Sequence, residues 1–303
     1  MASLAEASAR TTSARAERRR ARPLIATLPA VAWLLAFFAA PLVVFLVYSF
    51  LTNELYAVGL PFTVEAYADA LTSSLNRTLA RNSLVVGLLT AATTVIVGLP
   101  IAYWLRFVAR RSRLAVLFLI TASMFASYLV RIYAWRTVLG SRGLINSTLE
   151  RAGLIDEPVG FLLYSRFAVV VALVHIFLPY VVLVLFAGMG PVSEGLLESA
   201  RDLGANASLL WRRVLLPIMA APAFSAFVFV FILSSADYVT PQFLGGKDGV
   251  TLGVQIQQNF IAVGNWPLAA ATSFLMLLAF VTVYAIGSLA LRRLRLHDIR
   301  LAS

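Results

Sequence analysis

The sequence predicts an all-α membrane protein with six transmembrane helices. Hydrophobic residues make up 60% of the 303 positions and charged residues only 13%, and the mean hydropathy is +0.86. These values lie outside the range of soluble globular domains. The apolar residues also gather into long runs, each of at least about twenty residues, which is the length that a helix needs to cross a bilayer core of roughly 30 Å.

The six predicted spans lie near residues 24–51, 84–107, 114–139, 167–189, 214–235 and 267–291. Each should be helical, because in lipid only a helix or a closed barrel satisfies the backbone polar groups. Together the spans define one membrane domain over 24–291. A basic N-terminal tail at 1–23, expected to be retained on anionic lipid, and a short tail at 292–303 flank this domain.

Three longer loops connect the spans on the outer side, near residues 52–83, 140–166 and 236–266. The segment from Leu144 to Gly153 has the pattern of a short amphipathic helix at the membrane interface. The segment Pro241–Gly246 reads as a turn-rich mouth, in which Gly245 and Gly246 are free to adopt positive φ.

The basic residues predict how the chain is oriented. The sequence has 25 Lys and Arg residues, and Lys247 is the only lysine. Most of them lie at 10–22, 106–113, 201–213 and 292–300, on one side of the predicted membrane domain. Because positively charged segments remain in the cytoplasm, this bias predicts an N-in/C-in orientation.

Composition also excludes several functions. The sequence has no cysteine and two histidines, His175 and His297, without a metal-ligand partner at helical spacing, so we expect no metal site. It has no Gly-rich phosphate loop and no catalytic triad, which predicts a non-catalytic chain without a cofactor. Nucleic-acid binding is disfavoured because the arginines flank apolar segments rather than forming one basic face.

The charged segment 190–217 is unusual in so apolar a chain. Ser193 is placed to cap a short helix, with Glu194 in its first turn. Gly204 should end this helix in a sharp turn that a Cβ-bearing residue would resist. A second helix should then start near Ser208 and lead through Pro217 into the fifth span. The pattern predicts a short helix that stands off the membrane and binds another protein.

Ionisable groups near membrane depth are costly, and they are usually functional. One interpretation makes Asp237 a cation contact in a translocation pathway lined by Tyr128, Tyr133, Trp135 and Tyr238, since carboxylates and aromatic faces attract cations. The other interpretation pairs Asp237 with Arg131 or Arg136 in a structural bridge and assigns the aromatic residues to an interfacial belt. For His175, a hydrogen bond between helices is favoured.

The segment from Glu198 to Pro217 resembles the EAA loop of ABC-importer permeases, E-A-A-x3-G-x9-I-x-L-P. This chain departs from that pattern at Ser199, in place of Ala, and at Val214, in place of Ile. The resemblance implies that Glu198, Ser199 and Ala200 contact an ATPase and that Gly204 sets the turn before the chain reaches Pro217.

Four further segments resemble the permeases of spermidine/putrescine importers, in the PotB-like branch: Arg131-Ile-Tyr-Ala-Trp135, Gly143-Leu-Ile-Asn146, Asp202-Leu-Gly-Ala205 and Asn265-Trp-Pro-Leu-Ala-Ala-Ala-Thr-Ser273. The resemblance implies a type I importer permease (MetI-like) fold in a bacterial inner membrane. It also implies a second permease subunit, two ATPase subunits that bind ATP and Mg, and an extracytoplasmic solute-binding protein. The cargo would be a polyamine or another small solute, such as 2-aminoethylphosphonate, an opine or an amino-acid-like amine. A secondary transporter is disfavoured because no inverted repeat is found.

Overall fold

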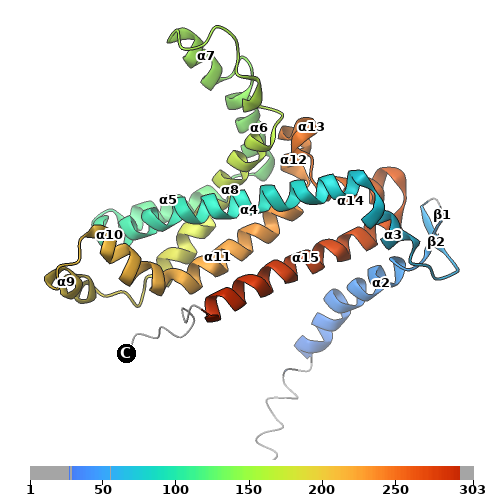
Figure 1. Cartoon of the computed structure of the whole chain (residues 1–303), viewed down its shortest axis with the longest axis horizontal. Helices are drawn as coiled ribbons and strands as arrows, with labels where there is room; N and C mark the ends of the chain where they lie inside the picture. The colour runs from blue at the N-terminus through green and yellow to red at the C-terminus, as the bar shows by residue number, and fades with distance from the viewer. Residues whose placement is uncertain (1–26, 28, 55, 294–303) are drawn as a thin grey trace, which may run out of the picture.

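The computed structural model describes residues 27, 29–54 and 56–293 of the chain, and Figure 1 shows their arrangement. The basic tail predicted at 1–23 and residues 294–303 lie outside the described residues. Among the described residues, five helical segments are long and apolar enough to cross a membrane: Pro29–Tyr48, Ser74–Val108, Arg166–Gly188, Ala207–Ala236 and Trp266–Arg293. The last of these includes Arg292 and Arg293, which the sequence assigned to the tail.

The third predicted span, 114–139, is wrong as a continuous helix. Helix α5 (Arg113–Met124) meets the segment Tyr128–Arg151, which begins with helix α6 (Tyr128–Leu139), at a bend of 94°. At this bend Arg131 Nη2 donates to the carbonyl oxygens of Ser123, Met124 and Ala126, at 2.9, 3.1 and 2.8 Å. The last carbonyl groups of a helix lack the regular intrahelical partners, and the guanidinium group supplies a donor to the carbonyls at and just after the end of α5. The described residues therefore contain five candidate spans, or six if the bent pair counts as one.

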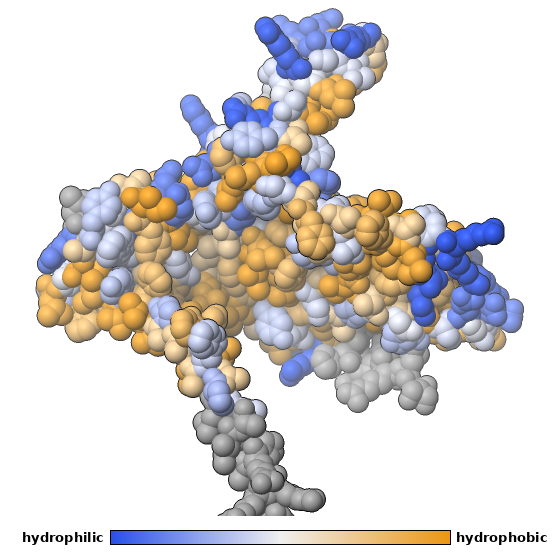
Figure 2. All heavy atoms as spheres, turned by 180° about the vertical axis from the view of Figure 1, so that it is seen from behind, coloured by the Kyte–Doolittle hydropathy of each residue, from blue (hydrophilic) through white to orange (hydrophobic). Residues whose placement is uncertain are grey.

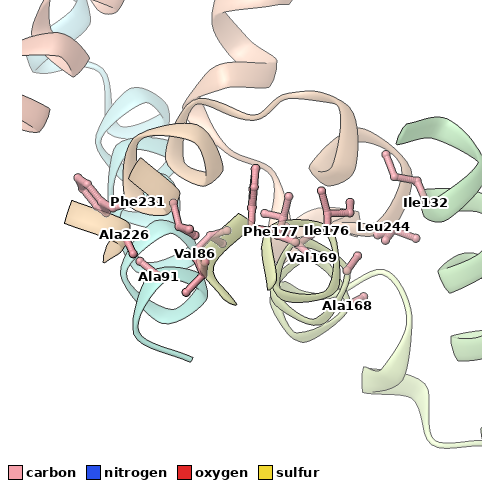
Figure 3. Packing of buried hydrophobic residues seen from close by; sticks show 14 of the residues in the cluster. Val86, Ala91, Ile132, Ala168, Val169, Ile176, Phe177, Ala226, Phe231 and Leu244 are labelled. Carbon is pink, nitrogen blue, oxygen red and sulfur yellow. The ribbon is translucent and has the colours of Figure 1, made fainter. Parts of the chain in front are cut away.

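Three helices form the packed centre of the molecule: α4 (Ser74–Tyr103), α8 (Arg166–Gly188) and α11 (Leu216–Ala236). Figure 3 shows their buried side chains, among them Val86, Phe177 and Phe231. The helices approach closely at Gly87, where an added Cβ atom would lie 1.8 Å from Ser235 Oγ. Small residues allow this kind of close packing between membrane helices.

The remaining long helices lie around this centre. Helix α15 (Trp266–Arg293) contacts helix α2 (Ala40–Tyr48), and α2 follows a π-helical turn at Leu35–Ala39. Aromatic pairs join the two regions: the ring centroids of Tyr48 and Trp266 are 6.2 Å apart. None of the most apolar stretch of the first span, Pro29–Tyr48, is buried against the rest of the chain. An apolar helix this exposed needs lipid or another protein around it.

The outer loops contain more structure than the sequence predicts. An antiparallel hairpin, β1 (Thr52–Glu54) and β2 (Ala57–Gly59), pairs Thr52 with Gly59 and is followed by α3 (Glu65–Thr72), so the fold is mostly rather than entirely α-helical. Helix α7 (Leu144–Arg151) confirms the short helix expected there, and a 3-10 turn spans Gly160–Leu162. In Figure 1, α7 projects from the helical body.

The segment predicted as a turn-rich mouth is mostly helical. Helix α12 (Val239–Leu244) includes Pro241, which is tolerated near a helix start because the first backbone NH groups need no partner there. Helices α13 (Gly246–Gly249) and α14 (Leu252–Gln258) follow, and a π-helical turn at Asn259–Val263 leads towards α15. Gly246 has a φ of +55°, whereas Gly245 remains at −80°.

Hydropathy varies along the surface in the way expected of a membrane protein. Figure 2 shows hydrophobic residues over much of the helical body, with hydrophilic residues gathered on the α7 arm and at one end. Exposed apolar side chains of the body include Ile96, Phe118 and Leu278. Apolar patches of this extent mark surfaces that lipid or other proteins cover.

Candidate functional site

The charged segment forms a separate helix with defined ends. Helix α9 (Glu194–Asp202) begins at Ser193, whose Oγ accepts a hydrogen bond from Leu196 N at 3.2 Å. This confirms the predicted N-cap. Glu194 lies in the first turn, where a negative charge is favoured by the helix dipole.

The end of α9 is a sharp turn at Gly204, where φ is +84°. Gly204 N donates to Arg201 O at 2.8 Å and Ala205 N donates to Ala200 O at 3.0 Å. This pair of bonds is the Schellman arrangement, in which a left-handed residue, usually glycine, closes a helix. An L-residue at this position would be strained even though no atom lies within 4 Å of the Cβ position.

One face of α9 packs on the rest of the chain. Leu197 is buried in a small cluster with Val192, Leu210 and Leu215. Tyr103 and Trp211 pack against this cluster, and their ring centroids are 5.3 Å apart. Because Tyr103 ends α4 and Trp211 lies just before α11, the cluster attaches α9 to both of these central helices.

The other face of α9 is open. Glu198 and Ser199 are exposed, and Ala200 is half-buried against the small cluster. Helix α10 (Ala207–Leu210) then starts at Asn206, whose Oδ1 accepts from Leu209 N at 2.9 Å. A π-helical turn at Trp211–Leu215 continues into Pro217 in the first turn of α11. The five predicted coupling residues therefore lie on one continuous path from an exposed helix face to a central span.

Two contacts to this region were missed by the sequence reasoning. Arg110 forms an ion pair with Glu194, and Arg106 Nη2 donates to Gly190 O at 3.5 Å. The sequence interpretation used both arginines only as markers of orientation. No sequence signal relates these positions, because the partners are 84 residues apart.

Among the predicted pathway residues, Asp237 lies where α11 ends and α12 begins. Its carboxylate accepts from Val239 N at 3.1 Å and from Thr240 N at 3.0 Å, so it caps α12 from the position before the N-cap residue Tyr238. The hydroxyl of Tyr128, at the start of α6, lies 2.9 Å from Thr240 Oγ1. The structure thus brings Tyr128 and Asp237 together through Thr240, a residue that the sequence did not single out.

The other three aromatic residues are not gathered around this group. Tyr133 packs on Phe243, with ring centroids 5.4 Å apart, and Trp135 packs edge-on against His175 at 5.7 Å. Tyr238 faces a different space, a groove of about 520 Å³ between α14 and α15 that is also lined by Gln257 and Ser273. Within this chain the five residues do not form one continuous lining.

The predicted bridge between Asp237 and an arginine is absent from the part of the chain that the structure describes. Arg131 is occupied by the carbonyl oxygens at the end of α5, and Arg136 Nη2 donates to Tyr164 OH at 3.2 Å. The bridge interpretation is therefore wrong, and the local role of Asp237 is that of a helix cap.

Comparison with known proteins finds similar transporter sequences and a similar solved fold. The chain is 29% identical over 272 residues to the spermidine/putrescine transport system permease protein PotB of Haemophilus influenzae, an alignment that covers 88% of this chain and 94% of that protein. It is 27% identical over 216 residues to the inner membrane ABC transporter permease protein YdcU of Escherichia coli, covering 67% and 68%. No protein-family model matches the chain.

The fold matches a solved transporter at lower sequence identity. A chain in the crystal structure of a bacterial alginate ABC transporter, in complex with an alginate pentasaccharide-bound periplasmic protein, superposes with a TM-score of 0.75. The match has 17% sequence identity and covers 91% of this chain and 96% of that chain. The chain therefore has the same fold as that chain of an ABC transporter, in agreement with the fold that the EAA-like segment implied.

Proposed function

We propose that this PotB-like ABC transporter permease forms half of the pore of an ATP-driven polyamine importer and is coupled to a cytoplasmic ATPase through α9. The chain is a multi-pass membrane protein homologous to inner-membrane ABC permeases. Permease subunits of ABC transporters are non-catalytic membrane components, and no cofactor is expected in this chain. ATP and Mg would be bound by the ATPase.

One observation carries the coupling proposal: α9 is anchored on one face and open on the other. Its anchored face packs on Leu210 and Leu215, next to the start of α11, while Glu198 points to solvent on an exposed turn. A partner that holds Glu198 and Ser199 would move α9 as a unit, because Leu197 fixes the helix to its own chain. Movement would reach the fifth span at Pro217.

The proposed assembly contains a second permease, two ATPase subunits and a solute-binding protein outside the membrane. The exposed first span and the broad apolar body agree with contacts to lipid and a second permease. An N-in/C-in orientation would place α9 and the arginines near it in the cytoplasm, as the positive-inside rule requires. The alginate transporter, which was solved with a periplasmic protein, has a partner of the same kind.

For the substrate we favour polyamines of the spermidine/putrescine type. The PotB relative is named for this cargo. The carboxylate of Asp237, close to Tyr128, would attract a cationic amine. The alternative is the same architecture with another small solute, such as 2-aminoethylphosphonate, an opine or an amino-acid-like amine. Secondary transport is disfavoured because the sequence has no inverted repeat.

Two experiments test the proposal. Affinity purification of the tagged chain from its native membrane should recover an ATPase and a second permease in stable association. Recovery of a lone chain that transports solute by itself would contradict the importer assignment.

A binding assay of the cognate solute-binding protein with putrescine, spermidine and 2-aminoethylphosphonate tests the substrate. Absence of polyamine binding would contradict the polyamine assignment and leave the importer architecture standing.

A further inference from the structure

Helix α4 continues into a π-helical turn at Trp104–Val108. A short basic turn follows before α5, and it lies next to the first turn of α9. We propose that Arg110 in this turn is a positioning residue for the coupling unit: it holds Glu194 so that α9 moves together with the end of α4 as well as with α11. This inference rests on the proposed coupling function of α9. It assigns a task to an arginine that the sequence marks only as a sign of orientation.

The turn that carries Arg110 is held in a fixed shape by a second arginine. Arg113 donates from Nε to Leu105 O at 3.1 Å and from Nη2 to Arg106 O at 2.6 Å. Ala109 is buried in a cluster with Leu105 and Val182, which ties the turn to α8. Arg110 therefore projects towards α9 from a backbone that is already fixed.

On the α9 side, the contact falls at the start of the helix. Glu194 is the first residue of α9, next to the capping residue Ser193. Arg106 adds a weaker contact to Gly190 O, just before the helix. Leu197 holds α9 one turn further on. A charged contact at the helix start and an apolar contact at its middle together determine the orientation of the helix axis.

Among the residues that the structure describes, the Arg110–Glu194 pair is the only salt bridge. Its two side chains are 62% and 50% exposed, so water screens the pair and its contribution to folding is small. An exposed pair of this kind can be reversed without burying an unpaired charge. Loss of the pair should therefore alter how α9 is held while the chain still folds and assembles.

The Arg110–Glu194 contact would give movement of α9 a second route to the central helices. Pro217 links the coupling unit to α11 through the backbone, whereas the side chain of Arg110 links it to the turn that follows α4 and the π-helical segment Trp104–Val108. Helices α4 and α11 pack closely against each other in the centre of the structure. A movement applied to α9 would then reach both members of this central pair at once, rather than bending α11 away from α4.

The test is a charge-reversal cycle in the assembled complex, reconstituted in vesicles with its ATPase, second permease and binding protein. Arg110→Glu and Glu194→Arg should each lower the substrate transported per ATP hydrolysed by roughly two- to five-fold, the scale that an exposed ion pair supports. The double variant should recover most of this loss. The matched control is Arg111→Glu, because Arg111 is exposed and directly follows Arg110. This variant should leave the substrate transported per ATP hydrolysed unchanged.

The outcomes are distinguishable. If the wild-type complex shows no ATP-dependent uptake, the proposed function fails. If the wild type transports but the single variants match it, or if the double variant shows no recovery, the positioning role fails. Impaired single variants without recovery in the double variant would mean that Arg110 or Glu194 acts on the ATPase instead.

A second measurement does not depend on reversing charges. The chain has no cysteine, so Arg110→Cys with Glu194→Cys introduces only two thiols. Joining these thiols with a cleavable bifunctional reagent should leave transport unchanged, because the turn and α9 are proposed to move together. A block of transport that reductant relieves would show that they separate during the cycle and would overturn the proposal.

Discussion

Glu194 and Glu198 lie one helical turn apart on α9, but only Glu194 has a charged partner, Arg110, within the described part of the chain. Residues at this spacing share a helix face. Glu198 is exposed and has no hydrogen bond there. The two acids thus divide the helix into a turn held by its own chain and a turn available to another protein.

The first prediction concerns this available turn. Glu198→Lys reverses the charge presented to the ATPase, so it should abolish uptake or prevent recovery of the ATPase, while the chain still inserts into the membrane. Membrane fractionation and co-purification measure the two effects separately. Glu150→Lys, at an exposed acid of α7 far along the chain, is the control. Normal uptake with Glu198→Lys would remove the coupling role.

The second prediction concerns the turn after α9. Gly204→Ala forces a Cβ-bearing residue to a φ of +84°, at a cost of about 1 kcal/mol. It should lower uptake several-fold, because the Schellman turn that aims α9 is weakened. Gly195→Ala is a closely matched control, since Gly195 lies within α9 with open space around it and alanine is favoured in a helix. Equal uptake of both variants would show that the turn geometry is unimportant.

The third prediction separates the cap from the charge at Asp237. Asparagine caps a helix about as well as aspartate, so Asp237→Asn should leave the amount of assembled complex unchanged and impair uptake of a cationic substrate. Asp237→Ala removes both functions and should also lower complex yield, with a loss of about 0.5–2 kcal/mol from the missing cap. If Asp237→Asn transports normally, Asp237 is a structural residue only.

The fourth prediction concerns the bend between α5 and α6. Arg131→Lys keeps the positive charge but carries it on a shorter side chain that lacks Nη2, the atom that donates to the carbonyls of Ser123, Met124 and Ala126. The variant should lose about 1–3 kcal/mol of stability, which is measurable as a lower unfolding temperature in detergent. Arg136→Lys is the control, because Arg136 makes a single contact to Tyr164. Equal unfolding temperatures would exclude Arg131 as the support of the bend.

The helical spans were predictable because long apolar runs leave few alternatives in lipid. The EAA-like segment was equally readable, since Ser193, Gly204 and Pro217 each carry a local backbone preference. The bend at residues 125–127 was not, because Phe-Ala-Ser contains neither Pro nor Gly. The break is stabilised instead by Arg131, whose apolar neighbours made it appear part of a continuous span. Likewise, no local pattern predicts that Tyr128 would meet Thr240.

The cap at Asp237 could have been found from sequence. An aspartate followed by Tyr238, Val239 and Thr240, with Pro241 after them, is a helix start of a common kind. The predicted position of Asp237 at the outer end of a span favoured a role for its charge over a role as a helix cap. In contrast, the Arg110–Glu194 pair depends on how α4 packs against α9, which is tertiary information.

The most direct measurement is uptake of labelled spermidine into vesicles that contain this chain, its ATPase, its second permease and its binding protein. We expect uptake that requires ATP on the α9 side of the membrane and that stops when this chain is omitted or carries Glu198→Lys. Uptake by this chain alone, without ATP, would contradict it.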